Sequence, residues 1–295
     1  MLLRWYNALL LRTGLRDELR ILIQPQRLVM LRLKHRFGNE GIIDRHDLAL
    51  TPAEEGHDTG LKPMFQDLWR PAVSALRTAL SDSRWQQVIP TIVLSSHFVR
   101  YAVIPWNVEL ANAAERDAYL RHCFVLAYGE TARHWDLRLS PAGFGQPALA
   151  SGIGTPLLEA IRIELEQAGL AAQNIYPNLV LAANETRAYL GKKNAGMSLC
   201  FVSLEPGRLC LGLVENGQWR SLKSLAAEAD VSAQLQALIQ RESIMAGLDT
   251  SHWPVIIHCS DTEDTEQIFL RGRMVKVVPA ITVFASGTDM YKLAA

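Results

Sequence analysis

The sequence predicts an α/β protein in two unequal lobes, and three features of the chain support that prediction. A strand-rich segment with hairpin turns opens the chain, helices then alternate with strands, and the same order begins again near Met197. The polar stretch 192–196 separates the two series. The second series contains Asn216-Gly217 between apolar runs, a strong hairpin signal. We therefore expect an amphipathic helix at 1–20, a first lobe at 21–194 and a reduced second lobe at 195–295.

The first lobe is expected to begin with two short strands around a turn at Gln24-Pro25-Gln26, because apolar residues on each side follow strand periodicity. A helix after Asn112 is indicated by the capping residue, and Thr155 is expected to cap another helix whose first residue is Pro156. The remaining elements follow from apolar periodicity and turn residues. They are strands at 42–50, 89–94, 98–104 (the neighbour of the strand before it), 135–139, 148–153 and 174–176, and helices at 63–80, 113–128, 156–168 and 179–190.

The second lobe is expected to repeat this plan with three consecutive strands joined by tight turns. Pro206-Gly207 and Asn216-Gly217 supply the turn residues between the strands. The predicted elements are strands at 197–204, 208–214, 218–225, 255–258 and 274–278, a helix at 226–246 and a terminal helix from Ala280.

Composition excludes several classes of protein. Of the 295 residues, 49% are hydrophobic, and 30 basic side chains balance 30 acidic ones, which is ordinary for a globular protein and unlike a disordered chain. A neutral chain also argues against a surface built for nucleic acid. The four cysteines form no Cys-x-x-Cys pair, and no segment has the ~20 apolar residues of a membrane span or the pattern of a secretory signal. We therefore expect a reduced, cytoplasmic setting.

The duplicated order resembles the actin-like ATPase (ribonuclease H-like) fold. More narrowly, the chain resembles the actin-like assembly proteins of type IV pili and type II secretion, the family of PilM, the GspL cytoplasmic domain and MshI. The resemblance rests on element order and apolar pattern from about residue 20 onward. The segments that show it are 21–33, 89–106, 157–170 and 199–213.

In this fold two hairpin turns hold phosphate, and each typically carries an Asp-x-Gly-like sequence whose acid positions the metal. The first turn has Gln24, Pro25 and Gln26, without acid or glycine, and proline removes an N–H donor. The second turn has Ser203 and Glu205 at the corresponding positions, with the carboxylate where the family has glycine. We therefore predict a degenerate site without a metal or catalytic residues, unless the alignment is shifted by a few residues.

The adenosine side of the fold usually has a Gly-Gly-type turn after a strand of the second lobe. Here strand 255–258 is followed by Cys259 and Ser260, which would obstruct close approach of a nucleotide to the backbone. No cofactor is expected. ATP with Mg²⁺ would enter only under the alternative hypothesis, an actin-fold ATP-binding protein or phosphotransferase with unusual phosphate loops.

Other residues that could carry chemistry have simpler interpretations. His122-Cys123 and His258-Cys259 place a base beside a thiol, but adjacent residues point in different directions, so neither pair acts without distant partners. Cys200 and Cys210 are expected to be small core residues. Histidines near the N-terminus lack the spacing of metal ligands, and Gly152-Ile-Gly154 before a helix is explained equally by an anion site or a helix-entry turn.

The amino-terminal segment combines an apolar stripe with arginines. Trp5, Arg12 and Arg16 are candidates for membrane or partner docking, and a helix packed on its own domain is the alternative. Residues 1–36 carry eight basic and two acidic side chains, a local charge of +6, so the rest of the chain carries −6. Such polarity suits a protein held near a membrane or an acidic partner.

The resemblance implies a non-catalytic cytoplasmic scaffold at the inner face of the bacterial inner membrane. Its partners would be pilus or secretion platform proteins, either a PilN-like segment in a groove or an assembly ATPase, with peripheral membrane contact through the N-terminal helix. An extended partner segment would add to a sheet edge. The secretion relatives continue into a membrane helix, whereas this sequence stops at Ala295, so we expect a partner or the N-terminal helix to reach the membrane. An unrelated α/β enzyme with a deep ionisable pocket is the third hypothesis.

Overall fold

The structure is a computed structural model of the full chain. It describes residues 17–36, 39–50, 68–110, 112–140, 142–170, 174–194, 196–259 and 268–279. The segment of Trp5, Arg12 and Arg16, the residue Ser260 and the helix predicted from Ala280 lie outside the described residues.

The first sheet has five strands in the order β3-β2-β1-β4-β8. Strands β1, β2 and β3 form an antiparallel meander, while β4 and β8 run parallel to β1. Alternation places the side chains of Leu19, Ile21 and Ile23 in the core, each fully buried. The strands are β1 (Asp17–Ile23), β2 (Arg27–Arg36), β3 (Asn39–Ala49), β4 (Val88–Leu94) and β8 (Asn174–Pro177).

Helices α2 (Arg70–Leu80) and α4 (Thr155–Gln167) belong with the first sheet and pack against each other. Helix α2 begins with proline at its first turn and buries Ala72, Val73 and Leu76. The 3₁₀ turn η1 (Ser83–Trp85) follows α2 and leads into β4.

The second sheet repeats the topology of the first, in the order β11-β10-β9-β12-β13. Again three antiparallel strands are followed by two strands parallel to the first of them. Asn216 and Gly217 have φ of 52° and 78°, the left-handed conformation that a two-residue hairpin turn requires. The elements are β9 (Leu199–Glu205), β10 (Arg208–Glu215), β11 (Gln218–Ala226), α6 (Val231–Ala246), β12 (Val255–Cys259) and β13 (Val275–Pro279).

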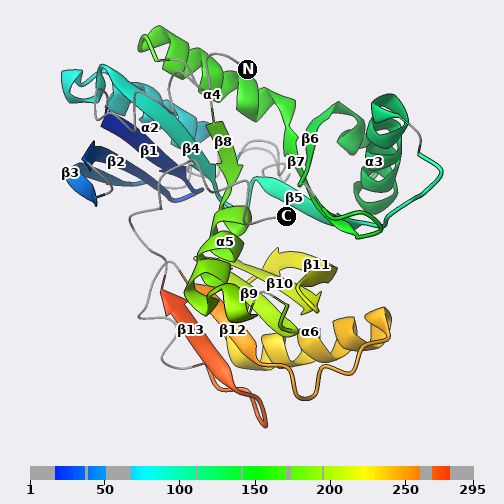
Figure 1. Ribbon diagram of the computed structural model, residues 1–295. Helices are drawn as coiled ribbons and strands as arrows, with labels where there is room; N and C mark the ends of the chain where they lie inside the picture. The colour runs from blue at the N-terminus through cyan, green and yellow to red at the C-terminus, as the bar shows by residue number, and fades with distance from the viewer. Residues whose placement is uncertain are drawn as a thin grey trace, which may run out of the picture. The chain divides into compact units, whose positions relative to one another are not determined.

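Helix α6 covers one face of this second sheet (Figure 1). Strand β9 alternates, so that Cys200, Val202 and Leu204 join the core under α6, where Leu235 and Ile239 are fully buried. Asp230 caps α6 by accepting a hydrogen bond from the Ala233 amide. Helix α6 does not cover the opposite face of the second sheet.

A third, three-stranded sheet has the order β5-β7-β6. Helix α3 packs on it around Phe124, which is fully buried, and β5 also lies against β11. Its elements are β5 (Val99–Ile104), α3 (Ala113–Tyr128), η2 (Glu130–His134), β6 (Trp135–Leu139) and β7 (Ala148–Gly154). Helix α5 (Asn178–Leu190) and the 3₁₀ turn η3 (Lys192–Asn194) connect β8 to β9.

Several predicted boundaries are wrong. Residues 17–20 of the predicted helix at 1–20 belong to β1, because strand alternation continues through Leu19 and the neighbouring strands fix the register. Helix α2 begins at Arg70, so residues 68–69 of the predicted helix at 63–80 are a turn. Gly154, not Thr155, is the N-cap of α4. Ala226 ends a strand, and its helix begins only at Val231.

The pairing of β5 also differs from the prediction. It was expected beside β4, yet β4 has β1 on one edge and β8 on the other. With both edges of β4 occupied, β5 pairs with β7 instead.

The chain forms two compact units that are not continuous in sequence. The first contains the described residues up to Phe98 and those of Ile153–Asn178, and the second contains Val99–Gly152 and the described residues from Leu179 onward. Residues 99–152 and 179–194 therefore cluster with the second sheet, whereas the sequence grouped them in a first lobe at 21–194. Within the described residues no helix is long and apolar enough to cross a bilayer.

Candidate functional site

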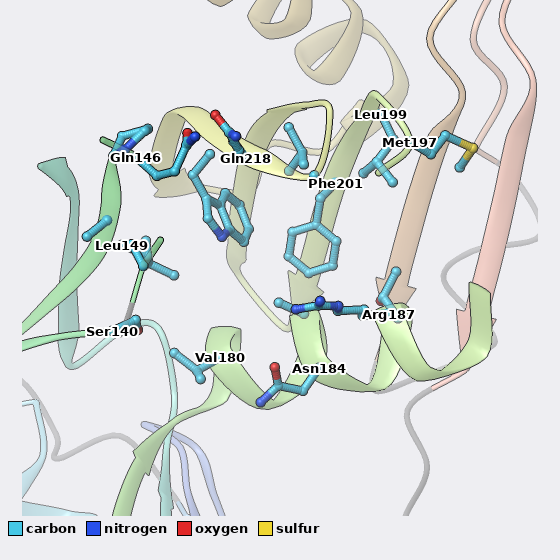
Figure 2. A pocket seen from close by; sticks show the side chains of 18 of the residues that line it. Ser140, Gln146, Leu149, Val180, Asn184, Arg187, Met197, Leu199, Phe201 and Gln218 are labelled. Atoms are coloured by element: carbon cyan, nitrogen blue, oxygen red, sulfur yellow. The ribbon is translucent and has the colours of Figure 1, made fainter. Parts of the chain in front are cut away.

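A cavity of about 280 Å³ lies in the second unit, on the face of the second sheet away from α6. Four parts of the chain form it: α5, the segment 194–197 that follows it, the β9–β10–β11 sheet, and the loop between β6 and β7 with the start of β7 (Figure 2). The lining is mainly apolar. It comprises Ser140, Ala142, Gly143, Gln146, Pro147, Ala148, Leu149, Val180, Ala183, Asn184, Thr186, Arg187, Leu190, Asn194, Met197, Leu199, Phe201, Val214, Gly217, Gln218 and Trp219.

A tryptophan lying over a glycine shapes the sheet side of the cavity. Gly212 is opposite Phe201 in the β9–β10 ladder, and a Cβ atom at Gly212 would lie 2.2 Å from Cζ3 of Trp219. The Trp219 ring meets the Phe201 ring edge to face, with centroids 5.8 Å apart and planes at 86°. Any side chain at Gly212 would therefore displace the indole, so a glycine inside a strand marks this wall.

Helix α5 supplies the opposite wall. Val180, Ala183, Asn184 and Arg187 recur at three- and four-residue spacing, so they lie on one helical face, and they all line the cavity. Among the lining residues within the described ranges, Arg187 is the one with a charged side chain. Thr186 also lines the cavity, is 3% exposed, and its hydroxyl has no hydrogen-bond partner. The lining of the cavity therefore combines apolar side chains with one guanidinium and one buried hydroxyl.

Neighbouring residues of α5 attach the helix to the sheet. Glu185 Oε2 lies 2.7 Å from Nε2 of His258, and both side chains are buried. One helical turn after Glu185, the ammonium of Lys276 lies over the ring of Tyr189, 4.6 Å from the ring centroid. These contacts to β12 and β13 fix the rotation of α5 and thereby direct Arg187 toward the cavity.

The first predicted phosphate turn is the tight connection between β1 and β2. The Gln24 amide donates to the Arg27 carbonyl over 3.0 Å, and Gln24 is 6% exposed. Gln26 is exposed, and its carbonyl accepts a hydrogen bond from the Leu50 amide at 2.8 Å. The turn therefore contains one buried glutamine, one exposed glutamine and a proline, with no carboxylate among its own residues.

The second predicted phosphate turn joins β9 to β10. Ser203 is 1% exposed with a hydroxyl that has no partner, and Glu205 is 3% exposed at the end of the strand. The turn itself is Pro206-Gly207, with Gly207 at a φ of 72°. Glycine thus stands at the turn, two residues beyond Glu205.

The adenosine-turn position Cys259 is 2% exposed and belongs to the core under α6. Burial also raises the pKa of the Cys200 thiol to about 11 and raises that of Cys123, which keeps these thiols protonated near neutral pH. Among the described residues, no three His, Cys, Asp or Glu side chains form a group able to hold a metal ion.

Reasoning from the sequence did not find the cavity. Its only local signals are the small and polar residues on one face of α5 and a glycine within the β10 strand. Neither signal shows which distant segment lies opposite, and the β6–β7 loop is supplied by another sheet.

No family model matches the chain, and no curated protein is significantly similar in sequence. Solved structures are similar. The PilM-PilN type IV pilus biogenesis complex matches with a TM-score of 0.60 and 11% identity, over 88% of this chain and 88% of that chain. The cytoplasmic domain of EpsL, an inner-membrane component of the type II secretion system of Vibrio cholerae, matches with a TM-score of 0.56 and 11% identity, over 94% and 92% of the two chains.

A third match is a protein of unknown function from Bacteroides thetaiotaomicron with an actin-like ATPase fold. It has a TM-score of 0.54 and 11% identity, and 97% of this chain and 98% of that chain are covered. Together with the duplicated strand order, these matches show that the chain has the actin-like ATPase fold. Within that class, the suspected likeness to actin-like pilus and type II secretion proteins is confirmed at the level of the fold.

Proposed function

We propose that this protein is a non-catalytic scaffold of a type IV pilus or type II secretion-like inner-membrane platform, with a degenerate nucleotide cleft. Its fold is shared with a pilus biogenesis complex and with the cytoplasmic domain of a secretion component. On this proposal it acts in the cytoplasm at the inner membrane face. Its partners are platform proteins, either a PilN-like segment or an assembly ATPase.

The residues at the two phosphate turns are the observation that carries this proposal. Phosphoryl transfer needs a metal to neutralise developing charge and backbone N–H groups that approach the phosphates. Gln24, Pro25 and Gln26 supply no acid, and the proline supplies no N–H donor. At the second turn the resemblance predicts Ser203 in place of the acid and Glu205 in place of the glycine; Gly207 stands two residues beyond Glu205, and the intervening Pro206 supplies no N–H donor. These substitutions favour a fold retained for binding.

The amino-terminal residues Trp5, Arg12 and Arg16 complete the proposal as a peripheral docking element. Comparing vesicle sedimentation of the full chain with that of a chain lacking residues 1–18 tests this part. Equal sedimentation of both chains on anionic vesicles would remove the membrane role.

Isothermal titration of the full chain with Mg-ATP tests the degenerate cleft. We expect no binding, and micromolar affinity would overturn the proposal in favour of an ATP-binding protein. Co-purification of the tagged chain from its native host tests the scaffold role. Recovery of pilus or secretion platform proteins is expected, whereas recovery of a metabolic complex would contradict it.

A further inference from the structure

We infer that the cavity between α5 and the second sheet is an anchor site for a partner protein. It takes a large apolar side chain of a partner segment that carries an Asp or Glu beside it. This inference rests on the proposed scaffold function and names where, and with what chemistry, a partner is held.

The size and lining of the cavity indicate the anchor. About 280 Å³ falls just below the ~300 Å³ at which pockets for drug-sized ligands begin, so the space suits one large side chain. Leu149, Leu199, Phe201 and Trp219 line it with apolar surface from two sheets. An apolar space that is already present in the structure lowers the cost of binding relative to one that must first be opened.

The charge of the cavity indicates the acid. Among the lining residues that the structure describes, Arg187 alone is charged, and none is an Asp or Glu that would repel an anion. A guanidinium recognises a carboxylate with paired N–H donors, so an anionic occupant is complementary here.

The loop that forms one side of the cavity indicates a protein partner. Phe144 lies between the lining residues Gly143 and Gln146, yet 86% of its surface is exposed. Its ring meets that of Trp106, 45% exposed, with centroids 4.9 Å apart and planes at 60°. Exposed aromatic pairs are typical of interface hot spots, and a small ligand held inside the cavity would leave this pair uncovered.

The test uses the full chain with ¹⁵N-labelled tryptophan and follows the indole signal of Trp219, assigned with a Trp219→Phe variant. The probes are acetyl-Phe-Glu-amide, acetyl-Phe-Gln-amide and acetyl-Ala-Glu-amide. We expect a saturable shift with the first probe, about tenfold weaker binding of the second because it loses the charged hydrogen bond, and no shift with the third. Absence of a shift with the first probe up to about 10 mM, or equal binding of all three, would overturn the inference.

Two leucine substitutions on α5 provide a matched pair. Ala183→Leu fills the cavity, whereas Ala188→Leu adds the same atoms on the exposed side of the same helix. We expect Ala183→Leu to abolish the shift and Ala188→Leu to leave it unchanged. Arg187→Gln should make the Phe-Glu and Phe-Gln probes bind equally. If Arg187→Gln impairs folding, the three probes and the two leucine variants still test the inference. Equal binding of the Phe-Glu probe by Ala183→Leu and Ala188→Leu would contradict it.

Co-purification with the same leucine variants separates this inference from the proposed function. Platform proteins recovered with Ala188→Leu but not with Ala183→Leu support both. If they are recovered equally with both variants, the anchor site is wrong and the scaffold role stands. If no platform protein is recovered with the wild-type chain while the Phe-Glu probe still binds, the scaffold role fails and the anchor chemistry stands.

Discussion

Replacing Gly212 by alanine should destabilise the protein, although the same change usually stabilises a chain. Gly→Ala at an unstrained position stabilises by about 0.4–1 kcal/mol through the unfolded state. At Gly212, however, the new Cβ would lie 2.2 Å from Cζ3 and 3.0 Å from Cε3 of Trp219, inside van der Waals contact. The indole would have to move in a packed wall, and overpacking of this kind costs about 1–3 kcal/mol. We therefore expect a net loss of about 0.5–2 kcal/mol.

Urea unfolding of the purified variants measures this loss as a lower midpoint at an unchanged slope. Gly196→Ala is the matched control, because a Cβ there meets nothing within 4 Å, and we expect it to be neutral or stabilising. In a Trp219→Leu background the clash partner is gone, so Gly212→Ala should cost little. A neutral or stabilising effect of Gly212→Ala in the wild-type chain would contradict the close packing of Trp219 on Gly212. An equal loss of unfolding free energy in the Trp219→Leu background and in the wild-type chain would contradict it as well.

Three further predictions concern other parts of the chain. The bidentate hydrogen bonds from Arg27 lower the pKa of Asp47 from 3.8 to about 2, so this carboxylate stabilises the fold above pH 4. That contribution should disappear as the pH falls from about 4 to 2. The Asp47→Asn variant should flatten this part of the curve of unfolding free energy against pH, measured by urea unfolding. Glu185→Ala leaves the buried His258 without its hydrogen-bonded carboxylate and should lower the unfolding free energy by about 1.5–3 kcal/mol, measured in the same way, with Glu185→Gln costing less. Cys200 is buried and its pKa is raised to about 11, so it should resist iodoacetamide at pH 8 in the native chain and react in urea. Peptide mass mapping measures the labelling. Rapid labelling of the native chain would contradict the buried position of Cys200.

Local signals account for the parts of the fold that the sequence predicted well. The turn at Asn216-Gly217 requires two left-handed residues, and few other residues adopt that conformation without cost. Asn112 accepts a hydrogen bond from the Glu115 amide as an N-cap should, so the start of α3 was predicted correctly. In both cases the information lay within four residues, although a local signal of the same kind placed the cap of α4 one residue late, at Thr155 instead of Gly154.

Long-range choices account for the errors. Nothing in residues 98–104 indicates that both edges of β4 are taken by β1 and β8, so the partner of β5 was wrong. The cavity was missed for the same reason, because Trp219 of β11 and Ala183 of α5 line one space only through the packing of a helix on a sheet. The two turns predicted to be degenerate differ from both cases, since Gln24 and Ser203 were assigned from a resemblance and their role in nucleotide binding stays a prediction.

The discontinuous make-up of the two units constrains how the chain folds during synthesis. The first sheet lacks its last strand, β8, until residue 177 has been added, which takes about 9–35 s at ribosomal rates. Residues 99–152 leave the ribosome before that sheet is complete, yet β11, against which β5 packs, ends only at Ala226. The side of β5 that packs against β11 therefore lacks that partner while roughly 120 further residues are made, so this contact forms late in synthesis.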